Sequence, residues 1–232
     1  MVNNKSLISI VMSAYNSEKT VDKAIKSILN QSYDNFEFLI MDDFSSDNTF
    51  RVCSEFAKTD KRIKVFQNKK NLGLTKSLNY LIKHADGKYI ARQDSDDISI
   101  NDRLKKQIDF ICKFDLDACS SRAMVMEENR IVPNISYYLP IGLVLRYKNP
   151  VIHGSLIMKK DVIEKLNFYN EDFEYSQDYE LIIRLYLNKF KFKIIKEPLY
   201  KLNMKNNISS QYKIEQKEYA VKAKNRLKTK HE

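Results

Sequence analysis

The stretch LISIVMSAYNSEKTVDKAIKSILNQ, residues 7–31, decides the fold of the first half of this chain. Its first six residues form a continuous apolar run, which is typical of a strand buried on both faces of a parallel sheet. Polar residues follow, and then apolar residues recur at helical spacing. The stretch therefore predicts a buried strand over 7–12, a polar loop, and a helix whose apolar face consists of Val21, Ala24, Ile25, Ile28 and Leu29.

The same alternation continues along the chain. Further apolar runs predict strands at 36–41, 63–67 and 88–92, and helical periodicity predicts helices at 48–58 and 74–85. This β-α-β-α-β-α-β order predicts an α/β fold with a parallel, doubly wound sheet. Ligands of such sheets bind beyond the carboxyl ends of the strands.

The second half is less regular, and we expect it to form a smaller, mixed region that caps the sheet and completes the site. Residues 117–133 predict two strands around a turn at Glu128 and Asn129. The remaining expected elements are helices at 103–114 and 178–189, a strand at 151–160, and an edge-like strand at 190–196.

The composition is that of a folded globular protein, with 43% hydrophobic and 30% charged residues. Cys53, Cys112 and Cys119 form no C-x-x-C pair, so we expect reduced thiols in a cytoplasmic protein. Met1 is followed by polar residues rather than by a signal peptide. The apolar runs are much shorter than the ~18 residues of a membrane span.

Positive charge is concentrated near the C-terminus. The whole chain has 40 Lys and Arg against 30 Asp and Glu, and residues 212–232 hold seven Lys or Arg against three Glu. This segment is either a solvated basic surface or a contact with anionic lipid headgroups or an anionic substrate. We find no helix-turn-helix, RNA-binding or zinc-finger motif, so no nucleic-acid partner is expected.

Four polar segments follow the first four predicted strands, and two of them are strongly acidic. They are SAYN (13–16), DDFSSDN (42–48), NKKNLG (68–73) and QDSDD (93–97). Because parallel strands end at one edge of a sheet, these segments are expected to lie together and to form the site.

The aspartates of the fourth segment have two interpretations. Asp94 and Asp96 are spaced so that both can turn toward one hard cation, such as Mg²⁺ or Mn²⁺. The alternative is a helix start, where Asp is favoured.

Other candidates are equally open when each is taken alone. Asp42 and Asp43 suit either turn and cap chemistry or a hydrogen bond to a base or ribose. Gly73 is expected at positive φ in a turn. Asp178 is either the N-cap of an apolar helix or a general base. His153, a lone histidine in a predicted strand, is more often structural than ligating.

Taken together, these motifs resemble the family 2 inverting glycosyltransferases of the GT-A fold, from about Ile8 to about Leu202. The stretches that carry the resemblance span 8–49, 71–79 (NLGLTKSLN), 87–98 (GKYIARQDSDDI), 149–160 (NPVIHGSLIMKK) and 176–185 (SQDYELIIRL). The resemblance implies a nucleotide-sugar-binding half at 1–97, an acceptor-binding and catalytic half at 98–205, and a basic helical extension at 206–232.

The resemblance also assigns roles to individual residues. Asp178 is the implied catalytic base, Asp96 the ligand of a Mn²⁺ or Mg²⁺ cofactor, and Asp43 the partner of the uracil of a UDP-sugar. His153, Gln177 and Arg184 are implied near the acceptor, the base or the diphosphate. The implied donor-binding residues are Ser13, Tyr15, Asn16, Glu18, Asp43, Asn71, Gly73, Lys76, Arg92 and Asp94.

The implied reaction is transfer of a single hexose or N-acetylhexosamine, with inversion, to a glycan or lipid-linked saccharide. Ser13 stands where the family often has Pro, and Gln177 where Glu is common; the Q-x-x-R-W signature of processive synthases is missing from the sequence. A phosphotransferase would place D-x-D after the first strand, and a nicotinamide enzyme G-x-G-x-x-G; neither occurs there. A non-catalytic nucleotide-sugar-binding or scaffold protein on the same fold stays open.

Overall fold

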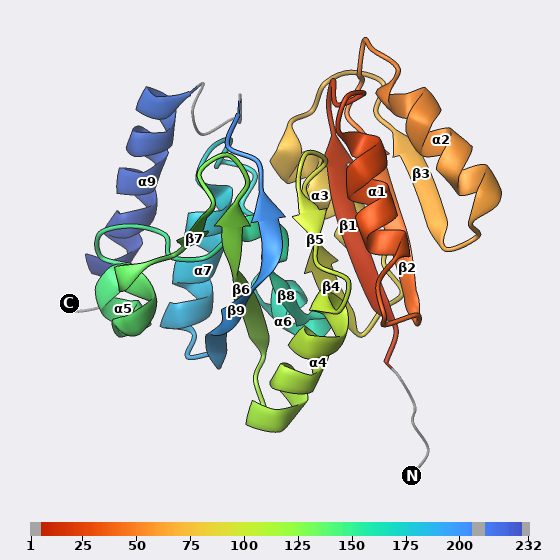
Figure 1. The fold of residues 1–232 in the computed structure, drawn as a ribbon. Helices are drawn as coiled ribbons and strands as arrows, with labels where there is room; N and C mark the ends of the chain where they lie inside the picture. Colours follow the sequence, from red (N-terminus) through yellow and green to blue (C-terminus); the bar gives the residue numbers. More distant parts are fainter. Residues whose placement is uncertain (1–5, 206–211, 229–232) are drawn as a thin grey trace.

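The computed structural model describes residues 6–205 and 212–228. Its centre is one nine-stranded sheet with the strand order β3-β2-β1-β4-β8-β6-β9-β5, and β7 pairs with β6 outside this path (Figure 1). The strands are β1 (Ile8–Ala14), β2 (Phe36–Asp42), β3 (Ile63–Gln67), β4 (Tyr89–Arg92), β5 (Ile98–Ser99), β6 (Ala118–Val125), β7 (Arg130–Val132), β8 (Ile157–Lys159) and β9 (Phe192–Leu202).

The first four of these strands are parallel, as the sequence predicts. β1 lies between β2 and β4, and its side chains are buried on both faces of the sheet. Ile8, Ile10 and Met12 pack into one core, whereas Val11 packs into the other. The continuous apolar run is therefore explained by helices covering both faces.

Helices lie on both sides of the sheet. One core contains side chains of α1 (Val21–Leu29), α2 (Thr49–Thr59) and α4 (Arg103–Phe114), which lie in front of the sheet in Figure 1. The other core contains side chains of α3 (Leu74–Lys83), α6 (Lys160–Lys165) and α7 (Gln177–Leu187). The expected α/β class, with a mostly parallel sheet and a mixed second region, is confirmed.

The mixed region begins where β8 pairs antiparallel with β4, and it continues through β6 and β9, which are parallel to each other. β9 was expected to be edge-like. Among the described strands, it pairs with β6 along its length and with β5 at Tyr200 and Lys201, which leaves its first part with an open edge.

One local expectation was wrong in part, and two alternatives that the sequence left open are excluded. The strand expected at 151–160 is confined to β8, and His153 lies in a 3-10 turn, η2 (His153–Ser155). α7 begins at Gln177 after Ser176, so Asp178 is a first-turn residue and not the N-cap. The aspartates at 94–97 do not start a helix, because β5 intervenes and α4 begins only at Arg103.

The C-terminal helix α9 (Lys213–Lys228) packs against α7 at the side of the molecule that Figure 1 shows on the left. Ala223 is fully buried in this contact, and the Tyr219 ring packs edge-on against Phe173. The helical extension expected at 206–232 is thus a helix over 213–228, and 206–211 and 229–232 lie outside the described residues. In the part of the chain that is described, none of the helices has the length and apolar character needed to cross a bilayer.

Candidate functional site

The loops that follow the parallel strands meet at one edge of the sheet, as predicted. The loops after β1 and β4 touch where the Ser17 and Ser95 hydroxyls lie 2.9 Å apart. The loops after β1 and β2 touch where the Asn16 amide donates to the Ser45 hydroxyl at 3.0 Å. The polar segments of three different strand ends therefore line one site.

The candidates after β1 are partly used to hold this loop. Asn16 has a φ of 48°, and its Oδ1 accepts hydrogen bonds from the amide and hydroxyl of Ser46. The Glu18 carboxylate accepts from the Asn48 amide and side chain at 3.0 Å. Tyr15 is 51% exposed and Ser13 is half-buried at the end of β1. Tyr15 and Ser13 thus remain accessible to a ligand.

Asp43 is buried and fixes the loop at 71–73. Its carboxylate accepts hydrogen bonds from the Asn68 side chain at 2.7 Å and from the Leu72 and Gly73 amides at 2.8 Å. Gly73 has the expected positive φ, at 84°. The exposed side chains of Asn71 and Lys76 flank it. Asp43 therefore holds the loop at 71–73, which forms one lip of the site. A nucleobase contact at Asp43 stays a prediction.

Arg92 lies under the site rather than at its surface. Its side chain is 1% exposed, it donates to the Val11 carbonyl at 2.8 Å, and it forms an ion pair with Asp94. Its Nε donates to His153 Nε2 at 3.3 Å. Arg92 therefore holds Asp94 in place, and donor binding by Arg92 stays a prediction.

His153 is held neutral beside this arginine. Burial, and then the Arg92 charge, lower the pKa of His153 to about 4. Its Nε2 lies 2.8 Å from the Tyr169 hydroxyl as well as near Arg92. His153 therefore connects Arg92 to the turn that carries Tyr169.

The three clustered aspartates have three different environments. Asp97 is 2% exposed, accepts from the Asn203 amide at 2.7 Å, and hydrogen-bonds with Tyr200. Asp94 pairs with Arg92, and its amide donates to the Tyr200 hydroxyl at 3.0 Å. Asp97 is thus structural and Asp94 is partly neutralised.

Asp96 is the half-buried carboxylate that remains for a ligand. Burial raises its pKa to about 6, and repulsion by the charges of Asp94 and Glu127 adds to this shift. Opposite charge close to such a carboxylate favours its ionised form. A cation at Asp96 would therefore relieve the electrostatic cost of this loop.

The donor set suits a cation that arrives with a phosphorylated ligand. Within the described residues there is no group of three or more His, Cys, Asp or Glu arranged to hold a metal ion. Mg²⁺ at phosphate sites uses one or two carboxylates, with water and phosphate oxygens as the other ligands. Asp96, with Asp94 beside it, fits that requirement.

The candidate base lies close to the same cluster. Asp178 is half-buried in the first turn of α7, and its Oδ2 accepts from the Asn149 side chain at 2.7 Å. Asp94 and Asp178 both act electrostatically on His153 and on Tyr169. The fold thus brings Asp178 beside the D-x-D segment, 84 residues earlier in the sequence.

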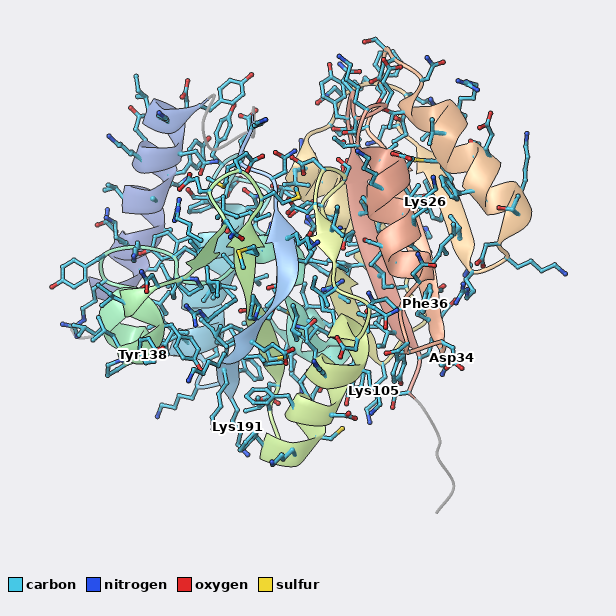
Figure 2. The ribbon with its side chains drawn as sticks, viewed as in Figure 1. Lys26, Asp34, Phe36, Lys105, Tyr138 and Lys191 are labelled. Carbon is cyan, nitrogen blue, oxygen red and sulfur yellow. The ribbon has the colours of Figure 1, made fainter. Side chains whose placement is uncertain are left out.

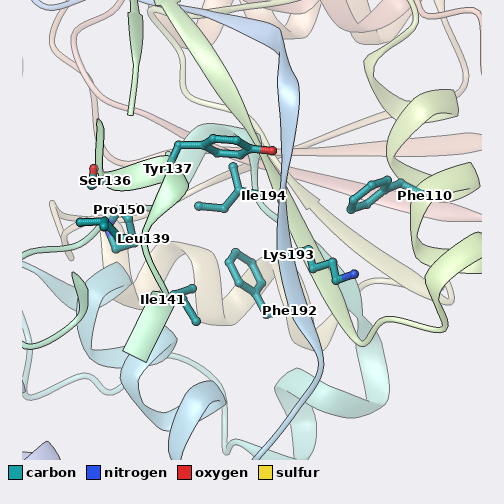
Figure 3. Close-up of a pocket in the computed structure, with 9 residues that line it drawn as sticks. All are labelled: Phe110, Ser136, Tyr137, Leu139, Ile141, Pro150, Phe192, Lys193 and Ile194. Carbon is teal, nitrogen blue, oxygen red and sulfur yellow. The ribbon is translucent and has the colours of Figure 1, made fainter. Parts of the chain in front are cut away.

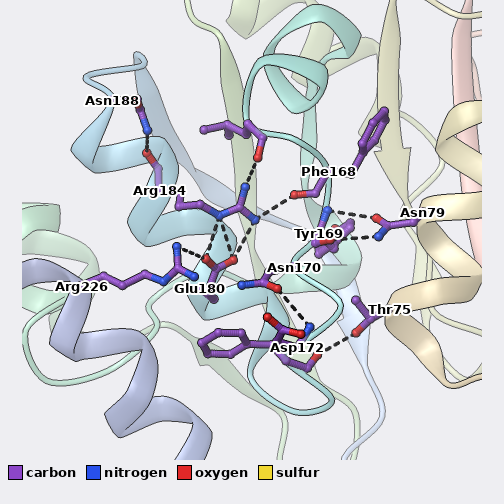
Figure 4. Close-up of polar contacts among 12 residues, drawn as sticks. Thr75, Asn79, Phe168, Tyr169, Asn170, Asp172, Glu180, Arg184, Asn188 and Arg226 are labelled. Atoms are coloured by element: carbon purple, nitrogen blue, oxygen red, sulfur yellow. Dashed lines mark hydrogen bonds and ion pairs between the residues drawn. The ribbon is translucent and has the colours of Figure 1, made fainter.

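Neither Gln177 nor Arg184 is open to a ligand: Gln177 is buried, and the Arg184 guanidinium has internal hydrogen-bond partners. Gln177 is 6% exposed. The Arg184 guanidinium pairs with Glu180, which is fully buried, and donates to the Leu166 and Phe168 carbonyls (Figure 4). Arg184 is therefore occupied with holding the turn at 166–168 on α7.

Sequence reasoning missed several residues that shape the site. Tyr200 hydrogen-bonds with both Asp94 and Asp97, Asn149 holds Asp178, and Tyr169 contacts His153. Arg103 is fully buried and donates to the Arg92 carbonyl at 3.2 Å. None of these residues lies in a polar segment after a parallel strand, so the pattern that located the site gave no signal for them.

Comparison with known proteins adds a family match. A family model described as glycosyl transferase family 2 matches residues 9–166. The chain is 34% identical over 210 residues to EpsE of Bacillus subtilis, a provisionally named glycosyltransferase, covering 87% of this chain and 74% of that protein. It is 36% identical over 175 residues to the UDP-Glc:α-D-GlcNAc-diphosphoundecaprenol β-1,3-glucosyltransferase WfgD of Escherichia coli, covering 75% and 68%.

Solved structures share the fold at low identity. TarS of S. aureus in complex with UDP-GlcNAc aligns with a TM-score of 0.76 at 22% identity, over 88% of this chain and 60% of that one. The mannosyltransferase PcManGT of Pyrobaculum calidifontis, in complex with GDP-Man and Mn²⁺, aligns with a TM-score of 0.74 at 16% identity, over 93% and 62%. This chain thus spans about three fifths of the length of these two solved chains, and the likeness shows a GT-A fold.

Proposed function

Because the chain belongs to glycosyl transferase family 2, we propose that it transfers a single sugar from a nucleotide-sugar donor to a saccharide acceptor, with inversion. The donor is proposed to be a UDP-sugar, the transferred group a hexose or N-acetylhexosamine, and the acceptor a glycan or lipid-linked saccharide. The name of WfgD, which states a UDP-Glc donor and a diphosphoundecaprenol-linked acceptor, supports this class of substrates. We place the enzyme in the cytoplasm.

The donor side of the proposal uses the strand-end loops. Exposed Tyr15 is available to stack on a nucleobase, and Asn71, Gly73 and Lys76 form the lip beside the proposed diphosphate. Asp43 fixes that lip through the amides of Leu72 and Gly73. The positive Lys76 side chain suits an anionic diphosphate.

Asp178 is proposed as the general base. An acceptor hydroxyl is a weak nucleophile, and it gives its proton to the Asp178 carboxylate as its oxygen bonds to the anomeric carbon. Asn149 holds Oδ2 at 2.7 Å, which orients the carboxylate. The start of α7 favours a negative charge at this position. As the new bond forms, the bond from the anomeric carbon to the nucleotide diphosphate breaks, so one displacement inverts the centre.

The leaving nucleotide diphosphate carries away the electron pair of the broken bond. Asp96, with Asp94, would hold a Mn²⁺ or Mg²⁺ ion, which neutralises charge that develops on the diphosphate. Arg92 fixes the Asp94 carboxylate from below, and Tyr200 fixes its backbone amide. These contacts keep the acidic loop in place while donors bind and leave.

One observation carries the proposal: the short segment 149–154 contacts both carboxylates, because Asn149 donates to Asp178 at 2.7 Å and Gly154 packs so closely against Asp94 that a Cβ would lie 2.6 Å from its Oδ2. A non-catalytic binding protein has no need of a carboxylate beside the D-x-D segment that is oriented by a separate side chain. The donor test is calorimetric titration with UDP, GDP, CMP and TDP, with and without Mn²⁺, on the wild type and Asp96→Ala.

We expect UDP to bind most tightly, Mn²⁺ to strengthen its binding, and Asp96→Ala to remove that strengthening. UDP-sugars are then screened for turnover with simple saccharide acceptors. If no nucleotide bound with or without Mn²⁺, the donor assignment would be wrong. If UDP bound but no UDP-sugar turned over with any acceptor, the scaffold alternative would be favoured.

A further inference from the structure

Large apolar side chains are exposed together on one segment of the mixed region. The segment runs from Asn134 to Lys148 and contains η1 (Ile135–Tyr138) and α5 (Ile141–Val144). We call its exposed apolar side chains the apolar patch: Ile135 (75% exposed), Tyr138 (66%), Leu139 (46%), Leu143 (45%) and Tyr147 (73%). Figure 2 shows Tyr138 beside α5 at the outer side of the molecule. Concentrated exposure of this kind marks an interaction surface.

The segment that carries the apolar patch contains basic but no acidic residues. No Asp or Glu occurs between Glu128 and Asp161, although the chain holds 30 acidic residues. The same interval contains five basic residues, and two of them, Arg146 and Lys148, are exposed on either side of Tyr147. A surface that combines apolar side chains, tyrosines and positive charge is complementary to an anionic bilayer surface.

An open pocket of about 450 Å³ adjoins the apolar patch (Figure 3). It lies between this segment and the first residues of β9, and its lining includes Leu139 of the patch with Tyr137, Ile141, Phe192 and Ile194. Part of β9 there has an open edge. The apolar lining gives acyl chains at the surface of a bilayer a place to pack.

We propose that the apolar patch docks the enzyme on a membrane surface that contains anionic lipids. The tyrosines and aliphatic side chains enter the interface, while Arg146 and Lys148 contact lipid headgroups. The sequence suggested the basic C-terminal segment for this contact. In the structure, however, α9 uses Ala223 and Tyr219 against the body of the protein and turns mainly charged side chains outward. Charge with only a few exposed apolar side chains, such as Ile214 and Val221 of α9, gives weaker attachment.

The apolar patch lies close to the proposed base, so docking would bring a lipid-linked acceptor to the site; this step rests on the proposed function. Tyr147 is two residues before Asn149, so their Cα atoms are at most about 7 Å apart. Asn149 holds the proposed base, Asp178. A saccharide linked to a lipid in the docked membrane therefore emerges next to the proposed base.

Vesicle co-sedimentation tests the inference without donor or acceptor, so its outcome is independent of the proposed reaction. The vesicles are pure phosphatidylcholine, or phosphatidylcholine with about one third phosphatidylglycerol, at low and high salt. The patch variant is Ile135→Ser with Leu143→Ser and Tyr147→Ser. The matched control variant is Ile214→Ser with Val221→Ser, which removes exposed apolar side chains from α9 (72% and 51% exposed). Circular dichroism checks that each variant is folded.

We expect the wild type and the α9 variant to bind anionic vesicles, and the patch variant to bind at least tenfold more weakly. Each basic residue at the surface contributes about fivefold, so Arg146→Glu with Lys148→Glu should weaken binding by about 25-fold or more. The inference is overturned if the patch variant binds like the wild type, or if only charge reversal at Lys213 and Lys217 of α9 abolishes binding. It is also overturned if the wild type does not bind vesicles and sedimentation velocity shows a dimer that the patch variant no longer forms.

Discussion

At the scale of single residues, the aspartates of the site differ in their hydrogen-bond and ion-pair partners. Asp97 is tied to Asn203 and Tyr200, Asp94 to Arg92, and Asp178 to Asn149. Asp96 is left with two acidic neighbours and a raised pKa. The same residue type thus fixes a loop at Asp97 and holds an arginine at Asp94, and we propose that it accepts a proton at Asp178 and binds a cation at Asp96. Burial and hydrogen bonding distinguish these four environments.

The first prediction concerns the proposed base. Asp178→Asn keeps the shape and a hydrogen-bonding partner for Asn149 but cannot accept a proton. We expect kcat/KM to fall by about 10²–10⁴-fold, while UDP affinity in calorimetry changes little. Asp172→Asn, at an exposed aspartate in the preceding turn, is the control and should retain activity. Full activity of Asp178→Asn would remove Asp178 from the mechanism.

The second prediction concerns the pH dependence of stability. The folded-state pKa of His153, about 4, lies below its ordinary value of 6.5, so the unfolded chain takes up the proton first as the pH falls. The stability that neutral His153 contributes is present above pH 6.5 and is lost between about pH 6.5 and 4. The loss attributable to His153 is up to roughly 3 kcal/mol.

Urea unfolding at pH 7.0, 6.0 and 5.0 measures this loss for the wild type, His153→Gln and the exposed control His84→Gln. The free energy of unfolding should fall less steeply with pH in His153→Gln than in the other two proteins. Differences between variants are needed, because the raised pKa values of Asp96 and Asp97 change stability in the opposite direction. Equal slopes for all three proteins would show that His153 is not the group responsible.

At the scale of elements, α7 is held by a buried ion cluster. Glu180 is fully buried and pairs with Arg184 of the same helix and with Arg226 of α9 (Figure 4). Arg184 also donates to the carbonyls of the turn at 166–168. One carboxylate therefore joins two helices, and through Arg184 it joins them to the turn that precedes Tyr169.

The third prediction follows from the number of partners that each arginine has. Arg184→Met leaves two carbonyls without their donor and weakens the compensation of Glu180, which should cost about 3–5 kcal/mol of unfolding free energy. Arg226→Met leaves the Arg184 pair intact and should cost about 1.5–3 kcal/mol. Arg51→Met, in an exposed pair with Glu55, should change stability by less than about 1 kcal/mol. Urea unfolding gives the three values, and a larger loss for Arg226→Met than for Arg184→Met would contradict this account.

The elements also show which parts of the fold the sequence could predict. The strands and helices of the first half can be predicted from local patterns. β1 and β2 are buried on both faces of the sheet and so have continuous apolar runs, whereas each helix buries one face and so has apolar residues at helical spacing. Tyr200 and Asn203, which hold Asp94 and Asp97, lie more than 100 residues away in β9 and just after it, so no local pattern could reveal them. The 3-10 turn at His153 has a similar cause: a Cβ at Gly154 would lie 2.3 Å from the Tyr200 hydroxyl and 2.6 Å from Asp94 Oδ2. That packing constraint, and not strand propensity, governs this segment.

At the scale of the whole molecule, the parallel and mixed regions share one sheet and two cores. Ile8 and Ile10 of β1 belong to the same core as Leu104, Cys119 and Leu199. Val11 shares the other core with Phe173 and Tyr179. The two halves that the sequence predicts are therefore joined by apolar packing on both faces, and we expect them to unfold together.

The fourth prediction uses two cysteines as probes of this cooperativity. Cys53 in α2 and Cys119 in β6 are both fully buried, whereas Cys112 is exposed and is replaced by serine. In dilute urea, the two thiols should react with a thiol reagent at rates within about threefold of each other, because both need global unfolding. Mass spectrometry of the labelled peptides distinguishes them. A tenfold faster reaction at Cys53 would mean that the first half opens independently.

The direction of β1 also determines how the protein is best attached to a solid support. Ile8, where β1 starts, lies at the end of the sheet opposite to Ala14, where the ligand loops begin. α9, in contrast, packs against the helix that carries Asp178. A biosensor chip that captures the chain through a tag ahead of Ile8 will therefore leave the strand-end loops open to the flowing analyte, whereas capture through the C-terminus brings the support toward α9 and α7.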